Sequence, residues 1–125
     1  MKKFEADVVL GMIERERITI MFAVPTMLHR FGESAAFKSR NLSSLRNVSY
    51  GAAPTPPEVL RPVIKRLPKT LLHIYGLTEA LHPVTTLKRE EHVQGNPKLG
   101  SIGKPTILCE MRVAKEDGSD AADGE

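Results

Sequence analysis

The segment Tyr75-Gly76-Leu77-Thr78-Glu79 places an aromatic ring, a glycine, a hydroxyl and a carboxylate directly after the apolar run 71–74. An aromatic ring can stack on a planar ligand, a hydroxyl can donate to a phosphate, and a carboxylate can bind Mg²⁺. A second turn of small residues, Gly51-Ala52-Ala53-Pro54, follows another predicted strand and allows a flat ligand to approach the backbone closely. Together the two turns predict a nucleotide site.

The same residues also allow a structural interpretation that needs no ligand. Tyr75 and Leu77 would then pack against the fold, and Thr78 would cap the turn that follows. From the pattern alone the two interpretations have about even weight, because short motifs recur by chance.

The two turns are connected by a helix and a second strand. Residues 46–50 predict the first strand and residues 70–75 the second, while Thr55-Pro56-Pro57-Glu58 has the form of a capping box with Thr55 as the N-cap. The apolar positions that predict the buried side of this helix are Val59, Leu60, Val63, Ile64 and Leu67. The side predicted to face water holds Arg61, Lys65 and Arg66. The unit predicts two parallel strands, and ligands bind beyond the carboxyl ends of such strands.

The chain before residue 46 predicts further helices and one more strand. Apolar residues at helical spacing predict a helix over about residues 5–16. Residues 18–24 form a continuous apolar run that is typical of a strand covered on both faces. Pro25 ends this strand, a helix is predicted to begin at Pro25 or Thr26, and Gly32 is predicted to interrupt or end it. This alternation indicates an α/β fold.

The chain after residue 79 predicts shorter elements. Pro83–Leu87 is a candidate strand, and Glu110–Ala114 alternates polar and apolar residues like a half-exposed strand. Asp117-Gly118 is a hairpin turn signal, and Asp123-Gly124-Glu125 is a second turn. A hairpin that stops at its turn predicts that the chain is part of a longer parent.

Composition excludes some classes of function. The net charge of +3 is spread among scattered Lys and Arg residues, so no nucleic-acid partner is predicted. Cys109 is the only cysteine and is interpreted as a small buried hydrophobe, which fits a reducing cytoplasm. The sequence lacks an apolar run of membrane-spanning length, so a cytoplasmic protein without a transmembrane segment is expected.

Five motifs, taken in order along the chain, resemble the adenylate-forming superfamily, which includes acyl-CoA synthetases, aryl-CoA ligases, luciferases and adenylation domains of peptide synthetases. Besides the two turns, the similar segments are 14–19 with 24–28, 41–46 and 100–105. The resemblance implies a three-layer α/β subdomain with a parallel, Rossmann-like or flavodoxin-like sheet over residues 1–105. It also implies that residues 106–125 begin a small β subdomain that is cut short.

Members of this superfamily use ATP and Mg²⁺ to convert a carboxylic acid to an acyl-adenylate, and pass the acyl group to a thiol such as coenzyme A. The resemblance implies catalytic roles for Thr78, at the α-phosphate, and for Glu79, as the Mg²⁺ ligand. The implied ATP or AMP site comprises Gly51, Ala52, Ala53, Pro54, Tyr75, Gly76 and Thr78, with Tyr75 stacked on the adenine. The implied acyl site comprises Ala52, Gly76, Ala80, Leu81 and His82. A fatty acid is the expected substrate, because it is the commoner one.

The sequence also departs from the superfamily pattern. The phosphate loop ending in lysine and the later motifs with the catalytic lysine do not occur, and residues 100–104 do not replace a phosphate loop because Pro105 follows Lys104. We therefore expect a fragment of an acyl-CoA ligase that is inactive alone. The alternatives are a stand-alone nucleotide-binding or interaction module without catalysis, and an inactive fragment that self-associates through uncovered sheet edges.

The four histidines do not have the spacing of a compact metal site. His73 lies on the same side of its predicted strand as Tyr75, so it is placed to approach the nucleotide. A hydrogen-bonded core or rim histidine is the preferred interpretation of His73.

Overall fold

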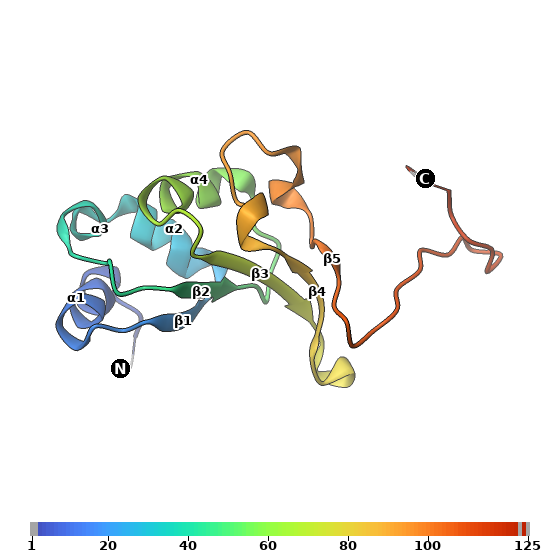
Figure 1. Ribbon diagram of the computed structural model, residues 1–125, viewed down its shortest axis with the longest axis horizontal. Helices are drawn as coiled ribbons and strands as arrows, with labels where there is room; N and C mark the ends of the chain where they lie inside the picture. The colour runs from blue at the N-terminus through green and yellow to red at the C-terminus, as the bar shows by residue number, and fades with distance from the viewer. Residues whose placement is uncertain (1–2, 123, 125) are drawn as a thin grey trace.

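Five strands lie side by side in one open sheet, in the order in which they occur along the chain (Figure 1). They are β1 (Ile20–Ala23), β2 (Asn47–Tyr50), β3 (Leu71–Gly76), β4 (Pro83–Leu87) and β5 (Lys104–Pro105). The computed structural model describes residues 3–122 and 124. β1, β2 and β3 are parallel, whereas β4 is antiparallel to β3 and β5 is antiparallel to β4. The predicted parallel strand–helix–strand unit is confirmed.

The direction of β4 follows from its short connection to β3. Residues 77–82 separate the two strands and include a single 3₁₀ turn, η1 (Thr78–Ala80). A parallel connection needs about a dozen residues or more, so the chain returns as an antiparallel partner. The strand predicted at Pro83–Leu87 is therefore present, and it places residues 77–82 in a loop beyond the end of β3.

Four α-helices accompany the parallel strands: α1 (Ala6–Glu16), α2 (Pro25–Glu33), α3 (Ala35–Ser39) and α4 (Pro57–Arg66). The predicted helices at residues 5–16 and from Pro25 onward are confirmed, and α2 ends one residue after Gly32. A Cβ atom at Gly32 would lie 2.9 Å from Cγ of Pro62 in α4. The glycine therefore allows α2 and α4 to pack closely.

The start of α4 corrects the predicted capping box. Pro56, rather than Thr55, is the N-cap, and the Thr55 hydroxyl donates to the carbonyl oxygen of Ala53 at 3.3 Å. The helix begins one residue later than the motif predicts, so the Thr55 side chain turns back toward the preceding loop. Prolines at positions 56 and 57 reduce the need for a cap, because neither has a backbone N–H to satisfy.

The hydrophobic core lies on one face of the sheet, between the strands and all four α-helices. The helices supply Leu10 and Ile13 from α1, Leu28 and Phe31 from α2, Phe37 from α3, and Leu60, Val63 and Ile64 from α4. Ala23, Val48, Tyr50 and Leu71 face them from the strands. The α/β fold class is confirmed, with one helical layer formed by the described residues.

The opposite face of the sheet is open at β1. Ile20 and Phe22 are 67% and 48% exposed, so the expectation that this strand is covered on both faces is wrong for the described chain. The physical reason is that α1 to α4 all contribute to the same core cluster. A second helical layer, needed for the predicted three-layer arrangement, is not formed within residues 3–122 and 124.

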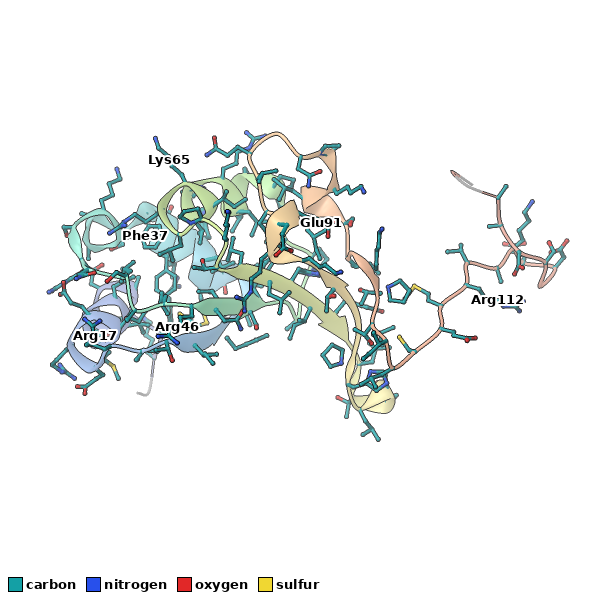
Figure 2. The ribbon with its side chains drawn as sticks, viewed as in Figure 1. Arg17, Phe37, Arg46, Lys65, Glu91 and Arg112 are labelled. Carbon is teal, nitrogen blue, oxygen red and sulfur yellow. The ribbon has the colours of Figure 1, made fainter. Side chains whose placement is uncertain are left out.

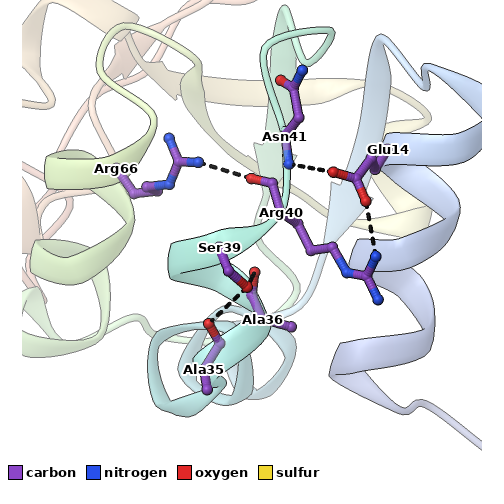
Figure 3. A network of polar contacts seen from close by, with 7 residues as sticks. All are labelled: Glu14, Ala35, Ala36, Ser39, Arg40, Asn41 and Arg66. Carbon is purple, nitrogen blue, oxygen red and sulfur yellow. Dashed lines mark hydrogen bonds and ion pairs between the residues drawn. The ribbon is translucent and has the colours of Figure 1, made fainter.

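A polar network fastens α1, the end of α3 and α4 together (Figure 3). Glu14 accepts hydrogen bonds from the backbone N–H of Asn41 at 2.7 Å and from the Arg40 guanidinium at 2.9 Å. These two bonds, chiefly the one from Asn41, lower the pKa of Glu14. Arg66 donates to the carbonyl oxygens of Arg40 and Phe37 at 2.9 and 3.1 Å. The expectation that Arg66 simply faces water is therefore wrong, because it binds the backbone that follows α3.

The chain after β5 runs away from the sheet, and Figure 2 shows Arg112 on this outlying segment. Within the described residues the strand predicted at Glu110–Ala114 reduces to a single bridge between Ala114 and Asp120. The turn at Asp117-Gly118 is confirmed, since Gly118 N–H donates to the carbonyl oxygen of Lys115. A neighbouring strand that would extend the ladder is not present in the described chain, while the predicted turn at Asp123 and Glu125 lies outside it.

Cys109 is half-buried at the margin of the sheet and does not join the core cluster. Its thiol donates to the carbonyl oxygen of Val84 in β4 at 3.0 Å. The interpretation of Cys109 as a buried hydrophobe is therefore only partly right, because a polar contact holds it. None of the helices in the described part of the chain is long and apolar enough to cross a membrane.

Candidate functional site

The two predicted turns meet at the carboxyl edge of the parallel strands. Tyr50, the last residue of β2, pairs with His73 of β3, so the turn that begins at Gly51 lies beside the end of β3. A Cβ atom at Gly51 would lie 2.2 Å from the carbonyl oxygen of Ile74, which explains why glycine is needed there. Ala52 has a φ of 70°, a strained value for a residue with a side chain. The first turn is therefore held tightly against β3.

A cavity of about 410 Å³ lies between the first turn, the end of β3 and residues 99–102. The predicted nucleotide residues that line it are Ala52, Ala53, Pro54, Tyr75 and Gly76. Lining residues that were not predicted to belong to the site are Tyr50, Thr55, Pro56, Pro57, Ile74, Leu99, Gly100, Ser101 and Ile102. We call this space the first hollow. Gly51 does not line it, but its lack of a side chain lets the turn approach β3 closely.

A second hollow, of about 470 Å³, lies beyond the first, toward the open face of the sheet. Of the predicted residues it is lined by Ala52, Tyr75, Gly76, Thr78, Leu81 and His82. Phe22, Ile74, Leu77 and Pro83 complete it. Ala52, Ile74, Tyr75 and Gly76 line both hollows, so one thin wall separates them.

The residues of η1 are divided between the second hollow and the surface. Thr78 lines the second hollow, whereas Glu79 is exposed and Ala80 is half-buried, and neither lines a hollow. The described residues contain no group of three His, Cys, Asp or Glu side chains that could hold a metal ion. A lone exposed carboxylate fits Mg²⁺ in one mode, in which substrate phosphates and water supply most of the ligands. Glu79 is compatible with that mode alone.

A buried cluster of Tyr50, His73 and His92 lies behind the first hollow. The Tyr50 hydroxyl is 3.0 Å from Nε2 of His92, and Nδ1 of His92 is 2.8 Å from the carbonyl oxygen of Lys88. Since a carbonyl can only accept, Nδ1 of His92 carries the proton, and Nε2 accepts from Tyr50. The ring centroids of Tyr50 and His73 are 4.9 Å apart, in an edge-on arrangement.

His73 is 7% exposed and lines the first hollow. Its Nδ1 is buried and has no hydrogen-bond partner among residues 3–122 and 124, while a hydrogen bond to the backbone of Ile102 engages the ring. The preferred interpretation of His73 as a hydrogen-bonded core histidine and its expected approach to the nucleotide site are therefore compatible.

Burial sets the protonation of this cluster. Burial lowers the pKa of His73, and the hydrogen bond to Ile102 opposes that effect. Burial also lowers the pKa of His92, and the nearby His73 lowers this pKa further. The hydrogen bond to Lys88 and the charges of Glu90 and Glu91 act in the opposite direction and raise it. Burial raises the pKa of Tyr50 above its usual value. All three side chains are therefore neutral at pH 7.

We expect the free energy of unfolding to fall as the pH is lowered from about 7 to about 5. The pKa of each buried histidine is lower in the folded chain than the ordinary value of 6.5, so the unfolded chain takes up protons first. The contribution of the neutral histidines to the free energy of unfolding is therefore fully present above pH 6.5. It is lost as the pH falls through the lowered pKa values. Urea unfolding at a series of pH values measures this.

The matched variants for this measurement are His92→Gln and His29→Gln. His92→Gln should flatten the pH dependence, whereas His29→Gln should leave it unchanged, because His29 lies on the exposed side of α2. Equal pH dependence in the wild type and in His92→Gln would contradict the expectation for His92.

Several site residues were missed from the sequence, each for a different reason. Phe22 was assigned to a fully covered strand, so its side chain was not expected at a hollow. Residues 100–105 were identified as a family-like segment and rejected as a phosphate loop, but they were not assigned to the site. His92 carries no local signal, since its partner Tyr50 is 42 residues away.

Comparisons with known proteins agree with this geometry. The family described as "AMP-binding enzyme" matches residues 1–125. A feruloyl-CoA synthase from Amycolatopsis sp. is 34% identical over 122 residues, and the medium/long-chain-fatty-acid–CoA ligase FadD8 from Mycobacterium tuberculosis is 34% identical over 123 residues. Each alignment covers 98% of this chain, but 24% and 21% of the two relatives.

A solved structure extends the likeness to three dimensions. The O-succinylbenzoate coenzyme A synthetase of Bacillus subtilis, in complex with ATP and magnesium ion, superimposes with a TM-score of 0.79 and 30% identity. The match covers 100% of this chain and 25% of that protein, so the chain spans about a quarter of the length of the relatives it matches. The chain belongs to the family of AMP-binding enzymes, and the two curated relatives named above are AMP-forming acid–CoA ligases.

Proposed function

We propose that this chain forms part of the nucleotide and acid site of an AMP-forming acid–CoA ligase. In this reaction an oxygen of the carboxylate attacks the α-phosphorus of ATP and the bond to pyrophosphate breaks. The sulfur of coenzyme A, which loses its proton, then attacks the acyl carbon of the adenylate, and the bond to AMP breaks as the thioester forms. The observation that carries the proposal is the pair of hollows that share Ala52, Tyr75 and Gly76. Such a shared wall suits a reaction in which a carboxylate and an α-phosphate must meet.

The first hollow is assigned to the adenosine part of ATP or AMP. Gly51 to Pro54 would lie along the adenine, and Tyr75, which is partly exposed, would stack on it. Gly76 lines both hollows, and a Cβ atom there would lie 2.9 Å from the carbonyl oxygen of His82, so glycine lets the two strands of this hairpin approach closely beside the site. Thr78 would donate to the α-phosphate, where negative charge grows in the transition state. Glu79 would hold Mg²⁺, which supplies positive charge to the phosphate oxygens when it is bound.

The second hollow is assigned to the acid. Phe22, Leu77 and Leu81 give it an apolar lining, with His82 at its side and Ala80 beside the turn. A fatty acid is the substrate class that we propose, and the likeness to a fatty-acid ligase supports it. An aromatic acid is the competing class, because a feruloyl-CoA synthase has the same identity to this chain.

The other expectations from the sequence remain predictions. They are the division at residues 105 and 106, the cytoplasmic location, the inactivity of the chain alone, and self-association. β1 is an edge strand with Ile20 and Phe22 exposed, which is the feature most relevant to self-association.

We expect weak binding of a non-hydrolysable acyl-sulfamoyl adenosine by the chain. Nuclear magnetic resonance detects weak binding residue by residue, and the amide signals of Ala52, Ala53, Gly76 and Thr78 should shift. Tyr75→Ala should weaken binding by about tenfold or more through lost stacking, while Tyr75→Phe should retain it. Comparison of octanoyl and feruloyl forms of the ligand tests the acid class.

The outcomes separate the proposals. If none of these four amides shifts at millimolar ligand, the assigned site is wrong. A pyrophosphate-exchange signal that Glu79→Ala abolishes would overturn the inactivity of the chain alone. Tight binding without exchange would favour the stand-alone nucleotide-binding module.

A further inference from the structure

We propose that Tyr50 and His92 are positioning residues, whose hydrogen bond holds residues 93–103 in place as one wall of the first hollow. The inference rests on the proposed function, which makes that hollow a nucleotide site. Tyr50 is the last residue of β2, and His92 directly follows η2 (Arg89–Glu91). Their side chains are buried, with 1% and 2% of the residue exposed.

The bond between Tyr50 and His92 joins two parts of the chain that share no strand pairing. Its length is 3.0 Å, and the hydrogen bond from Nδ1 of His92 to Lys88 leaves Nε2 to accept. Tyr50 directly precedes the Gly51–Pro54 turn, on the other side of the hollow. This bond connects the floor of the hollow, at the end of β2, to the start of its wall. A second bond, from Arg89 of η2 to the side-chain oxygen of Asn47 at 3.0 Å, ties η2 to the other end of β2.

The wall itself is tied mainly to its own residues between these anchors. The Asn96 side chain donates to the carbonyl oxygen of Glu91 at 2.6 Å. It also accepts from the Lys98 N–H at 3.0 Å, and this second bond caps the start of η3 (Pro97–Gly100). Leu99 is buried in the core. At the far end, the carbonyl oxygen of Ile102 accepts from the Thr85 hydroxyl at 2.6 Å. His92 and Ile102 are thus the polar attachments of the wall to the sheet.

The hydrogen bond depends on the neutral state of His92. Protonation would add a hydrogen to Nε2, which could then no longer accept from Tyr50, and would place a charge among buried rings. The groups that face His92 are Tyr50 from β2, His73 from β3, and the Lys88 carbonyl with Glu90 and Glu91 from the η2 segment. Burial prevails over the two carboxylates and lowers the pKa of His92. The wall should therefore be held at pH 7 and loosen only as the pH falls through this lowered pKa, which lies below the ordinary value of a histidine.

Tyr50→Phe tests the bond, since it keeps the ring and removes only the hydroxyl. At pH 7 the amides of residues 93–101 should exchange with deuterium about five- to tenfold faster in Tyr50→Phe than in the wild type, and affinity for the acyl-sulfamoyl adenosine should fall by a similar factor. The wild-type affinity should also fall as the pH is lowered from 7 through the lowered pKa of His92. His92→Gln should reduce that pH dependence to the part that His73 contributes, and the matched control His29→Gln should retain it in full.

The two readouts distinguish this inference from the proposed function. Hydrogen exchange requires no ligand, so a wild type that binds no nucleotide analogue refutes the proposed function while exchange still tests the bond. Exchange in residues 93–101 that is unchanged by Tyr50→Phe, or that rises equally in β1, would refute the positioning role. So would an unchanged affinity in Tyr50→Phe, or a pH dependence as steep in His92→Gln as in the wild type.

Discussion

Gly103→Ala should lower the free energy of unfolding by about 3 kcal/mol or more. Gly103 has a φ of 83°, and a Cβ atom there would lie 2.0 Å from the carbonyl oxygen of Thr86 in β4. Thr86 lies in β4 and Gly103 directly precedes β5. Neither backbone can therefore move away without breaking the pairing of β4 with β5. Urea unfolding followed by circular dichroism measures the loss.

Gly95→Ala is the matched control for this substitution. Gly95 has nearly the same backbone angle, a φ of 82°, but an added Cβ would meet no atom of the described chain within 4 Å. Gly95→Ala should therefore lower the free energy of unfolding by about 1 kcal/mol, which reflects the left-handed conformation alone. The difference between the two variants isolates the steric contact with Thr86, and equal losses would show that this contact is relieved without strain.

Leu60→Ala should lower the free energy of unfolding by about 2–5 kcal/mol. Leu60 lies on the buried side of α4, is completely inaccessible to solvent, and belongs to the core that α4 shares with α2 and the sheet. Truncation removes apolar contacts and leaves a cavity that closely packed neighbours cannot fill. The midpoint of urea unfolding should shift with little change in its slope.

Leu108→Ala provides the same chemical change at an exposed position. Leu108 is 69% exposed in the segment that leaves the sheet, so its truncation should change stability by less than about 0.5 kcal/mol. A loss in Leu108→Ala as large as that in Leu60→Ala would mean that the outlying segment packs in solution, contrary to the structure.

Local pattern was sufficient to predict the elements that carry the site. The strands before Gly51 and Tyr75 and the buried stripe of α4 follow from periodicity, because burial on one side imposes it. The turns at the strand ends were predicted from the small residues that follow each apolar run, and the structure shows that a Cβ atom at Gly51 or Gly76 would clash with the neighbouring backbone. Their convergence on two adjacent hollows follows from parallel pairing, which the intervening helix requires.

Contacts between distant residues were beyond local pattern. The apolar run of β1 could not show which of its faces would be covered, since that depends on where the helices pack. The one-residue shift at the start of α4 arose because neither Pro56 nor Pro57 has a backbone N–H, so the first turn needs no side-chain cap from Thr55. The Tyr50–His92 bond joins polar atoms 42 residues apart, and neither residue type nor spacing announces it.

The antiparallel return of β4 also bears on the order in which the site assembles during folding. β3 and β4 are joined by six residues, so closing this hairpin costs little chain entropy and is expected within microseconds. β2 can pair with β3 only after the crossover through α4 has formed. Residues 93–103 can close over the site only after the hairpin and this crossover are both in place. We expect Tyr75 to Glu79 to be arranged early on the folding pathway, and the enclosure around them to close last.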